Sequence, residues 1–192
     1  MNDKYRRPLA ILIILALALI VGLGTDMAWR LIDRSVYPQE YSEIVSKYAA
    51  EYNVPEDVIY ATIKVESNFD PEAISVAGAR GLMQMLPSTF EWLTGEEHLS
   101  EHLTPNLLFD PEVNIRYGTY YLKYLYTKFD YNWNTASAAY NGGEGNVAKW
   151  LSDKNYSDGE GNLVSFPKEF GETKNYVKKI RHSRDMYLKL YY

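Results

Sequence analysis

The sequence predicts a mainly α-helical fold, preceded by one apolar helix at the N-terminus. After residue 40, apolar residues recur at spacings of three and four, the period of an amphipathic helix, and no stretch keeps the alternation of a half-buried strand. Proline and acidic residues stand where the predicted helices begin, and Gly or Asn stands where they end. With 192 residues, of which 46% are hydrophobic, the chain is long enough for one domain with a sizeable core.

The first thirty residues have the pattern of a signal anchor. Lys4, Arg6 and Arg7 precede an unbroken apolar run from Leu9 to Val21. With the small residues that follow it, this run covers roughly 16 residues, fewer than the ~20 that span a bilayer without tilt. No small-x-small cleavage site follows the run, which favours an uncleaved anchor over a cleaved signal peptide.

The domain boundaries follow from this pattern. We predict a signal anchor or signal peptide at 1–29, a polar connector at 30–40 and one helical domain at 41–192. Because basic flanks stay in the cytoplasm, the domain should lie on the extracytoplasmic side of a bacterial membrane, held by a single pass. The alternative is a domain that is secreted after the signal has been cleaved.

Three short helices are expected in the first half of the domain. The first covers 41–53, with Ser42 as its cap, and the second covers 55–67, with a proline at its first position. The third covers 87–93 and is stopped by a glycine. The segment 68–81 between the second and third helices reads as a loop, because it contains an Asp-Pro pair and two glycines.

Four further helices are expected in the second half. Asp110 caps a long helix that has proline at its first position, and 133–140 is rich in the small residues of a tightly packed buried helix. A short helix carries Trp150, and a last one starts near Glu172 and runs to the C-terminus. The segment 154–171 reads as an exposed loop that could hold a small β element.

The amino-acid composition argues against several classes of function for this protein. The net charge is −5 and no basic run follows the first seven residues, which argues against nucleic acid as a partner. The absence of cysteine excludes disulfides, thiolate metal sites, a cysteine nucleophile and a lipidated cysteine. His98 and His102 are four residues apart, but their polar neighbours and Pro105 favour a surface loop over a metal site. Composition therefore gives no sign of a metal site.

One acidic residue combines features that suit a general acid. On a helical wheel Ile59, Ile63 and Glu66 fall within about 60° of one another. Glu66 also lies at the C-terminal end of its helix, where the helix dipole disfavours an anion. Desolvation and the dipole both raise a carboxyl pKa, and a carboxyl that is protonated near neutral pH can protonate a leaving group. The ordinary alternative is a solvated glutamate at a helix end.

The residues after Glu66 add to this interpretation. The chain leaves the helix at once, so the carboxyl faces a loop rather than another helical turn. Gly78 and Gly81 allow backbone to approach a ligand closely. Gln84 lies between two methionines and needs a hydrogen-bond partner if it is buried, which is either loop backbone or a sugar hydroxyl or acetamide.

Four segments together resemble a known family. In chain order they are 66–71, 81–84, 139–143 and 172–177, and they are similar to the four blocks of the soluble lytic transglycosylase catalytic domain. That domain belongs to glycoside hydrolase family 23, which also holds goose-type lysozymes. The resemblance covers roughly 40–190 and implies a lysozyme-like helical domain with a long substrate cleft.

The resemblance implies a set of site residues. Glu66 matches the family's catalytic acid. The residues that match positions lining the family's sugar site, and that we predict to bind substrate, are Ser75, Gln84, Tyr140, Asn141, Glu172 and Tyr176. Two departures are visible: Gly142 stands where the family usually has alanine, and Lys174 stands where it usually has arginine, which would weaken a bidentate contact.

The reaction that the resemblance implies is cleavage of peptidoglycan glycan strands without water, and it requires no metal and no cofactor. Glu66 would protonate the β-1,4 oxygen between N-acetylmuramic acid and N-acetylglucosamine, and the muramic C6 hydroxyl would close onto C1 to give a 1,6-anhydromuramyl end. Glu172 is a possible second carboxylate, although helix N-terminal capping explains it equally well. The alternatives are a hydrolytic muramidase on the same fold, a non-catalytic peptidoglycan-binding module and a structural helical membrane protein.

Overall fold

The computed structural model describes residues 3–192, apart from the side chains of 3–11, 13 and 14. The side chains of the basic flank, Lys4, Arg6 and Arg7, therefore lie outside the described part of the chain. The chain divides into two compact units, Met1–Pro38 and Gln39–Tyr192.

The first unit contains one long helix, α1 (Asp3–Val36). Within it, Leu15–Val36 is long and apolar enough to cross a membrane, with a mean hydropathy of 1.6, although signal sequences meet the same criterion. The helix continues through most of the segment that we predict to be a connector. Inside the helix, Arg30 pairs with Asp26 one turn earlier at 3.0 Å, an i,i+4 pair that suits a helix surface.

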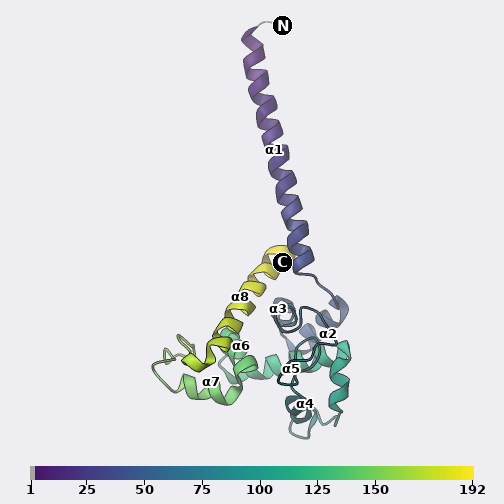
Figure 1. Ribbon diagram of the computed structural model, residues 1–192, viewed down its shortest axis with the longest axis vertical. Helices are drawn as coiled ribbons and strands as arrows, with labels where there is room; N and C mark the ends of the chain where they lie inside the picture. Colours follow the sequence, from purple (N-terminus) through teal and green to yellow (C-terminus); the bar gives the residue numbers. More distant parts are fainter. Residues whose placement is uncertain (1–2) are drawn as a thin grey trace. The chain divides into compact units, whose positions relative to one another are not determined.

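The second unit is built from helices, as the sequence predicts (Figure 1). Its elements are α2 (Ser42–Tyr52), α3 (Glu56–Glu66), α4 (Pro87–Thr94), η1 (Pro105–Phe109), α5 (Pro111–Lys128), α6 (Trp133–Gly142), α7 (Glu144–Leu151), η2 (Lys168–Phe170) and α8 (Gly171–Tyr191). Within residues 3–192 the only β pairing consists of isolated bridges. The mainly α fold is confirmed, and the two short 3-10 helices were not predicted.

The helices of the second unit pack in pairs, and their buried apolar side chains form separate clusters, one around α6 and α7 and another around α4 and η1. Helix α3 packs against α8, α6 packs against both α8 and α5, and α2 packs against α5. In α6, the small residues Ala136, Ser137, Ala138 and Ala139 are buried, so that neighbouring helices can approach closely. Because α3, α6 and α8 meet in this way, residues far apart in the sequence come together at the end of α3.

Helix ends agree with the sequence at some positions and differ at others. Asp110 caps α5 as predicted, because its Oδ1 accepts a 3.0 Å hydrogen bond from the Val113 amide. The prediction that Ser42 caps α2 was wrong: Tyr41 holds that position, with φ 57° and no side-chain cap. Helix α6 continues to Gly142, two residues further than predicted, and ends at Gly143 with φ 83°.

Two loops contain β bridges. The bridge between Ser157 and Leu163 lies in the segment where we predicted a small β element. In the loop after α3, Arg80 bridges both Ile74 and Met85, a feature the sequence analysis did not predict. This loop is tied to the end of α3 by Ser67, whose Oγ donates a 2.7 Å hydrogen bond to the Leu82 carbonyl.

Candidate active site

Glu66 is the last residue of α3, and its side chain is half-buried. The hydroxyl of Tyr176, on α8, donates a 2.7 Å hydrogen bond to Glu66 Oε1. Burial raises the pKa of Glu66 from 4.5 to about 7, and the Tyr176 hydrogen bond opposes this by favouring the carboxylate. The carboxyl group is therefore protonated in a large fraction of molecules at neutral pH, as the sequence analysis expected for a general acid.

Tyr176 and Tyr140 both lie near this carboxyl group, but their hydroxyl groups have different hydrogen-bond partners. Tyr176 is buried and contacts Glu66 directly, whereas the Tyr140 hydroxyl donates a 2.8 Å hydrogen bond to the Met83 carbonyl. Burial, together with the nearby Glu66 charge, raises the pKa of both tyrosines well above the ordinary value. Both therefore keep their hydroxyl protons, so Tyr176 remains a donor to Glu66 and Tyr140 remains a donor to the loop.

The loop that Tyr140 holds is fixed by a buried asparagine that the sequence analysis missed. Asn114, on α5, is fully buried, and its Oδ1 accepts a 2.7 Å hydrogen bond from the Met83 amide. Its Nδ2 donates to the carbonyls of Arg80 at 2.9 Å and Leu108 at 2.7 Å. One amide side chain thus satisfies three backbone groups and positions the loop across the cleft from α3.

A glycine allows this arrangement. Gly81 adopts φ 74°, and a Cβ there would fall onto the Leu108 carbonyl and the Asn114 side chain. Any other residue would both strain the backbone and displace the asparagine. The sequence analysis expected Gly81 to let backbone approach a ligand. In the structure Gly81 instead leaves room for the Asn114 side chain.

Ser75 and Gln84 both line the cleft, and both are tied to their own loop. Ser75 Oγ accepts a 3.0 Å hydrogen bond from the Ala79 amide. Gln84 has φ 47°, and its Nε2 donates to the carbonyls of Ala73 at 2.9 Å and Gly81 at 3.0 Å. The sequence analysis left two partners open for Gln84, loop backbone or a sugar group. In the structure the side-chain nitrogen of Gln84 binds loop backbone.

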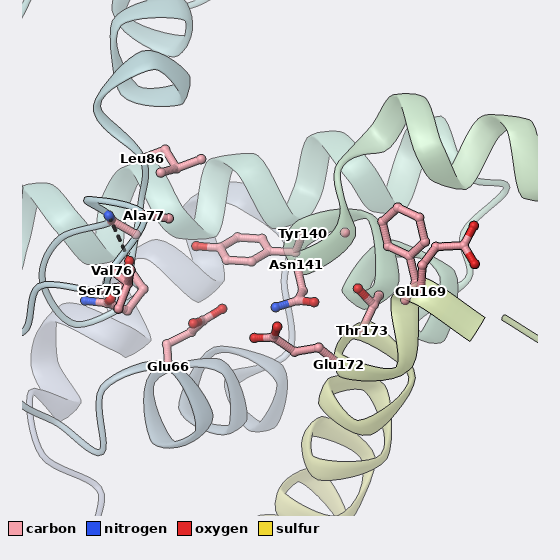
Figure 2. A pocket seen from close by; sticks show the side chains of 14 residues that line it. Glu66, Ser75, Val76, Ala77, Leu86, Tyr140, Asn141, Glu169, Glu172 and Thr173 are labelled. Atoms are coloured by element: carbon pink, nitrogen blue, oxygen red, sulfur yellow. Dashed lines mark hydrogen bonds between the residues drawn. The ribbon is translucent and has the colours of Figure 1, made fainter. Parts of the chain in front are cut away.

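The cleft itself has a volume of about 780 Å³. Figure 2 shows the carboxyl groups of Glu66 and Glu172 pointing into the same space, with the Asn141 amide directed between them. Glu172 and Asn141 are exposed, whereas Glu66 is half-buried. Six of the seven predicted site residues line this hollow, and Tyr176 lines the wall of an adjoining hollow of about 720 Å³ that also contains Glu66.

The Glu172 carboxylate lines this cleft and also lies in the first turn of α8. An acidic side chain there interacts favourably with the helix N-terminus, so the helix explains the position of Glu172 as well as the cleft does. Lys174, the departure from the family pattern two residues later, lines a different hollow on the other side of α8. Lys174 is not among the residues that line the cleft with Glu66.

His98 and His102, for which the sequence favours a surface loop over a metal site, make two different contacts. His98 Nδ1 lies 3.1 Å from the Tyr120 hydroxyl, and His102 Nε2 lies 3.0 Å from Glu96 Oε1. Among the described residues, no group of three or more His, Cys, Asp or Glu side chains could hold a metal ion. The side chains that line the cleft offer carboxyl, phenol, amide and hydroxyl groups.

Comparison with known proteins agrees with this geometry. The family model described as "Transglycosylase SLT domain" matches residues 43–162. The soluble lytic murein transglycosylase of Escherichia coli (strain K12) is 36% identical over 146 residues, which are 75% of this chain and 22% of that protein. The membrane-bound lytic murein transglycosylase C of Yersinia pestis (strain Pestoides F) is 34% identical over 170 residues, covering 77% of this chain and 46% of that protein.

Solved structures share the fold. The 70 kDa soluble lytic transglycosylase from Escherichia coli superposes with a TM-score of 0.72 at 33% identity, over 81% of this chain and 25% of that one. An inactive glutamate-to-glutamine mutant of the lytic transglycosylase Slt from Pseudomonas aeruginosa gives a TM-score of 0.69 at 28% identity, over 88% and 29%. The chain thus spans less than half the length of these curated relatives, and it has their lysozyme-like helical fold. The match over most of the domain shows that the chain belongs to the transglycosylase SLT domain family.

Proposed function

We propose that this protein is a peptidoglycan lytic transglycosylase that cleaves the β-1,4 bond between N-acetylmuramic acid and N-acetylglucosamine and leaves 1,6-anhydromuramyl ends. The observation that carries the proposal is the Glu66 carboxyl group, whose pKa burial raises to about 7, in a cleft of about 780 Å³. A cleft of this size is within the ordinary range for sites that bind small molecules. The names of the relatives support the same activity.

The hydrogen bond from Tyr176 decides which oxygen of Glu66 reacts. Because Oε1 accepts that bond, the proton of the neutral carboxyl group belongs on Oε2, the oxygen left for substrate. Glu66 gives this proton to the glycosidic oxygen as the bond from that oxygen to C1 of the muramic residue breaks. The carboxylate then takes the C6 hydroxyl proton as O6 bonds to C1, so Glu66 ends the cycle protonated and no water is consumed.

The substrate-binding roles belong to the same proposal. Tyr176 orients Glu66, and Tyr140 and Gln84 shape the wall that faces it. Asn141 and Glu172 present exposed polar groups to the space above Glu66, where they can bind hydroxyl or acetamide groups. Ser75 lines the opposite rim on the loop after α3.

A second candidate function is hydrolysis on the same fold, favoured by Glu172. Two carboxyl groups that face one cleft are the arrangement of ordinary glycosidases, in which one of them activates water. Mass spectrometry of fragments from purified sacculi separates the two reactions, because a reducing muramic end is one water heavier than an anhydro end. Anhydro ends alone support the transglycosylase, and reducing ends alone would replace it with a muramidase.

The pH dependence of cleavage is expected to change when Tyr176 is substituted, because its hydrogen bond lowers the pKa of Glu66. Wild-type kcat/KM should fall as pH rises through about 7, since Glu66 must be protonated to act as an acid. Tyr176→Phe removes a bond that lowers this pKa, so the alkaline limb should move upward by about 1 pH unit, with a fall in kcat of about tenfold. Tyr140→Phe is the matched control, because its hydroxyl bonds to Met83 instead. An alkaline limb that stays in place in Tyr176→Phe would contradict this role.

Membrane attachment is proposed from the N-terminal unit. The apolar stretch Leu15–Val36 would hold the protein in the membrane by a single pass, with the domain at 41–192 on the extracytoplasmic side. We expect the full chain in the membrane fraction and a chain that starts at Gln39 in the soluble fraction. Added protease should digest the domain in spheroplasts without lysis; protection until lysis would reverse the proposed topology.

A further inference from the structure

One peptide unit of the loop after α3 is bound by two helices at once. This unit, between Leu82 and Met83, donates its N–H to Asn114 Oδ1 on α5 at 2.7 Å. Its carbonyl, on Leu82, accepts a 2.7 Å hydrogen bond from Ser67 Oγ at the end of α3. The next carbonyl along the chain, on Met83, accepts a 2.8 Å hydrogen bond from the Tyr140 hydroxyl of α6. Three helices thus meet at two consecutive residues of the loop.

The side chains of the same two residues anchor the loop inside the domain. Leu82 and Met83 are both fully buried. Met83 packs on Gly118 of α5, where a Cβ would fall onto its sulfur atom. The close packing leaves this segment no room to slide along α5. The hydrogen bond from Ser67 then links the fixed segment to the end of α3.

Ser67 directly follows Glu66, so this link acts next to the carboxyl group. Ser67 is the C-cap of α3, and its amide donates a 3.1 Å hydrogen bond to the Ile63 carbonyl. Its hydroxyl also lies 3.3 Å from that carbonyl, but the 2.7 Å bond to Leu82 is shorter. Ser67 is half-buried and is not among the residues that line the cleft or the adjoining hollow. It therefore acts through Glu66 and not on substrate.

Burial is the main reason that Glu66 holds a proton near neutral pH. Burial raises the pKa of Glu66 to about 7, and the hydrogen bond from Tyr176 opposes this. Tyr140 and Tyr176 stay neutral themselves, because burial raises the pKa of both well above the ordinary value. The other charged groups that line the two hollows are exposed: Glu169, Glu172, Lys178 and Lys179. The protonation of Glu66 therefore depends mainly on how closely its surroundings exclude water.

We propose that Ser67 is a positioning residue for Glu66, because its hydroxyl holds the end of α3 against the loop and so limits the access of water to the Glu66 carboxyl group. This inference rests on the proposed function for its effect on cleavage. Its effect on the protonation of Glu66 is a property of the fold alone. Ser67 and Tyr176 then act in opposite directions: Ser67 favours the neutral acid, and Tyr176 favours the carboxylate.

The test uses three variants of the full chain in detergent. Ser67→Ala removes the hydroxyl and keeps the backbone bond to the Ile63 carbonyl. Ser67→Thr keeps a hydroxyl at the same position and is the conservative variant that should restore the link. Ser137→Ala is the matched control, because Ser137 Oγ donates a bond of the same length, 2.7 Å, to the Trp133 carbonyl of its own helix instead of to the loop.

In Ser67→Ala the alkaline limb of kcat/KM should move down by about 1 pH unit, opposite to the shift expected for Tyr176→Phe. On purified glycan strands, kcat/KM should then fall about eightfold at pH 7.5 but less than about twofold at pH 5, where Glu66 is protonated in both proteins. Ser67→Thr and Ser137→Ala should leave the limb in place. An unmoved limb in Ser67→Ala, or the same loss at both pH values, would overturn the positioning role.

Unfolding experiments provide a readout that needs no activity. Wild-type stability falls as pH rises from 4.5 to about 7, because the folded state keeps the Glu66 proton over this range. In Ser67→Ala this fall should end about 1 pH unit lower. A wild-type profile in Ser67→Ala would again reject the role. Failure of the proposed function has a different signature: wild type would release no anhydro ends at any pH, while the stability profiles would still report on Ser67.

Discussion

Glu66→Gln is expected to lower the release of 1,6-anhydromuropeptides from purified sacculi by about 10²–10⁴-fold, the range for removal of a general acid. The amide keeps the size of the side chain, and its Oε1 can still accept the hydrogen bond from Tyr176. It has no acidic proton to give to the glycosidic oxygen and cannot take one from the C6 hydroxyl. Release of fragments would be quantified by mass spectrometry, and full activity in this variant would end the assignment of Glu66.

Glu66→Gln is also expected to change the stability of the domain. Measuring this change shows at the same time that the variant is folded. Because burial raises the folded-state pKa of Glu66 from 4.5 to about 7, the folded state binds more protons, and stability falls as pH rises between these values. Glutamine lacks this penalty, so the variant should be more stable than wild type by about 1–3 kcal/mol at pH 8 and similar to it at pH 4. Thermal unfolding at both pH values measures the difference.

Glu172→Gln is the matched control for both measurements. This carboxylate faces the same cleft but is exposed at the start of α8. We expect its substitution to leave the stability difference between pH 4 and pH 8 nearly unchanged. In the anhydro reaction Glu172 binds substrate, so activity should fall far less than in Glu66→Gln. A loss as large as that of Glu66→Gln would favour the hydrolytic reaction with two carboxyl groups.

The sequence predicted Glu66 for a reason that is local. The helical period places it on the face of Ile59 and Ile63, and both isoleucines are fully buried. The direction of its pKa shift follows from that burial alone. Its hydrogen-bond partner, Tyr176, is 110 residues away, and no spacing within one helix could reveal it. The family resemblance placed Tyr176 near the site, whereas the bond itself required the packing of α3 against α8.

The loop after α3 was the part least accessible from the sequence. Its shape depends on backbone conformations that ordinary residues seldom adopt, including φ 52° at Asn68, φ 68° at Phe69 and φ 47° at Gln84. Propensities assign such residues to a loop but do not say how the loop folds. The bridges of Arg80 and the hydrogen bonds of Asn114 supply that information, and they come from residues distant in sequence.

Asn114 left one signal in the sequence: it is a polar residue inside the first turns of a long helix, where asparagine has a low propensity. We expect Asn114→Leu to destabilise the domain by about 3–5 kcal/mol, because the Met83 amide and the carbonyls of Arg80 and Leu108 lose their partners while staying buried. Urea unfolding measures this change. At urea concentrations where the variant remains folded, activity should also fall, since the loop that Tyr140 contacts has lost its support.

Thr119→Val, on the same helix, separates the lost hydrogen bonds from a general intolerance to substitution. Thr119 is as buried as Asn114, but its Oγ1 has no hydrogen-bond partner within the described structure. Valine has nearly the same shape and removes a buried polar atom that gains nothing in the folded state, so the variant should be neutral or more stable. If both variants lose several kcal/mol, packing along α5 controls stability. If only Asn114→Leu does, the position of the wall opposite Glu66 is set by one amide group.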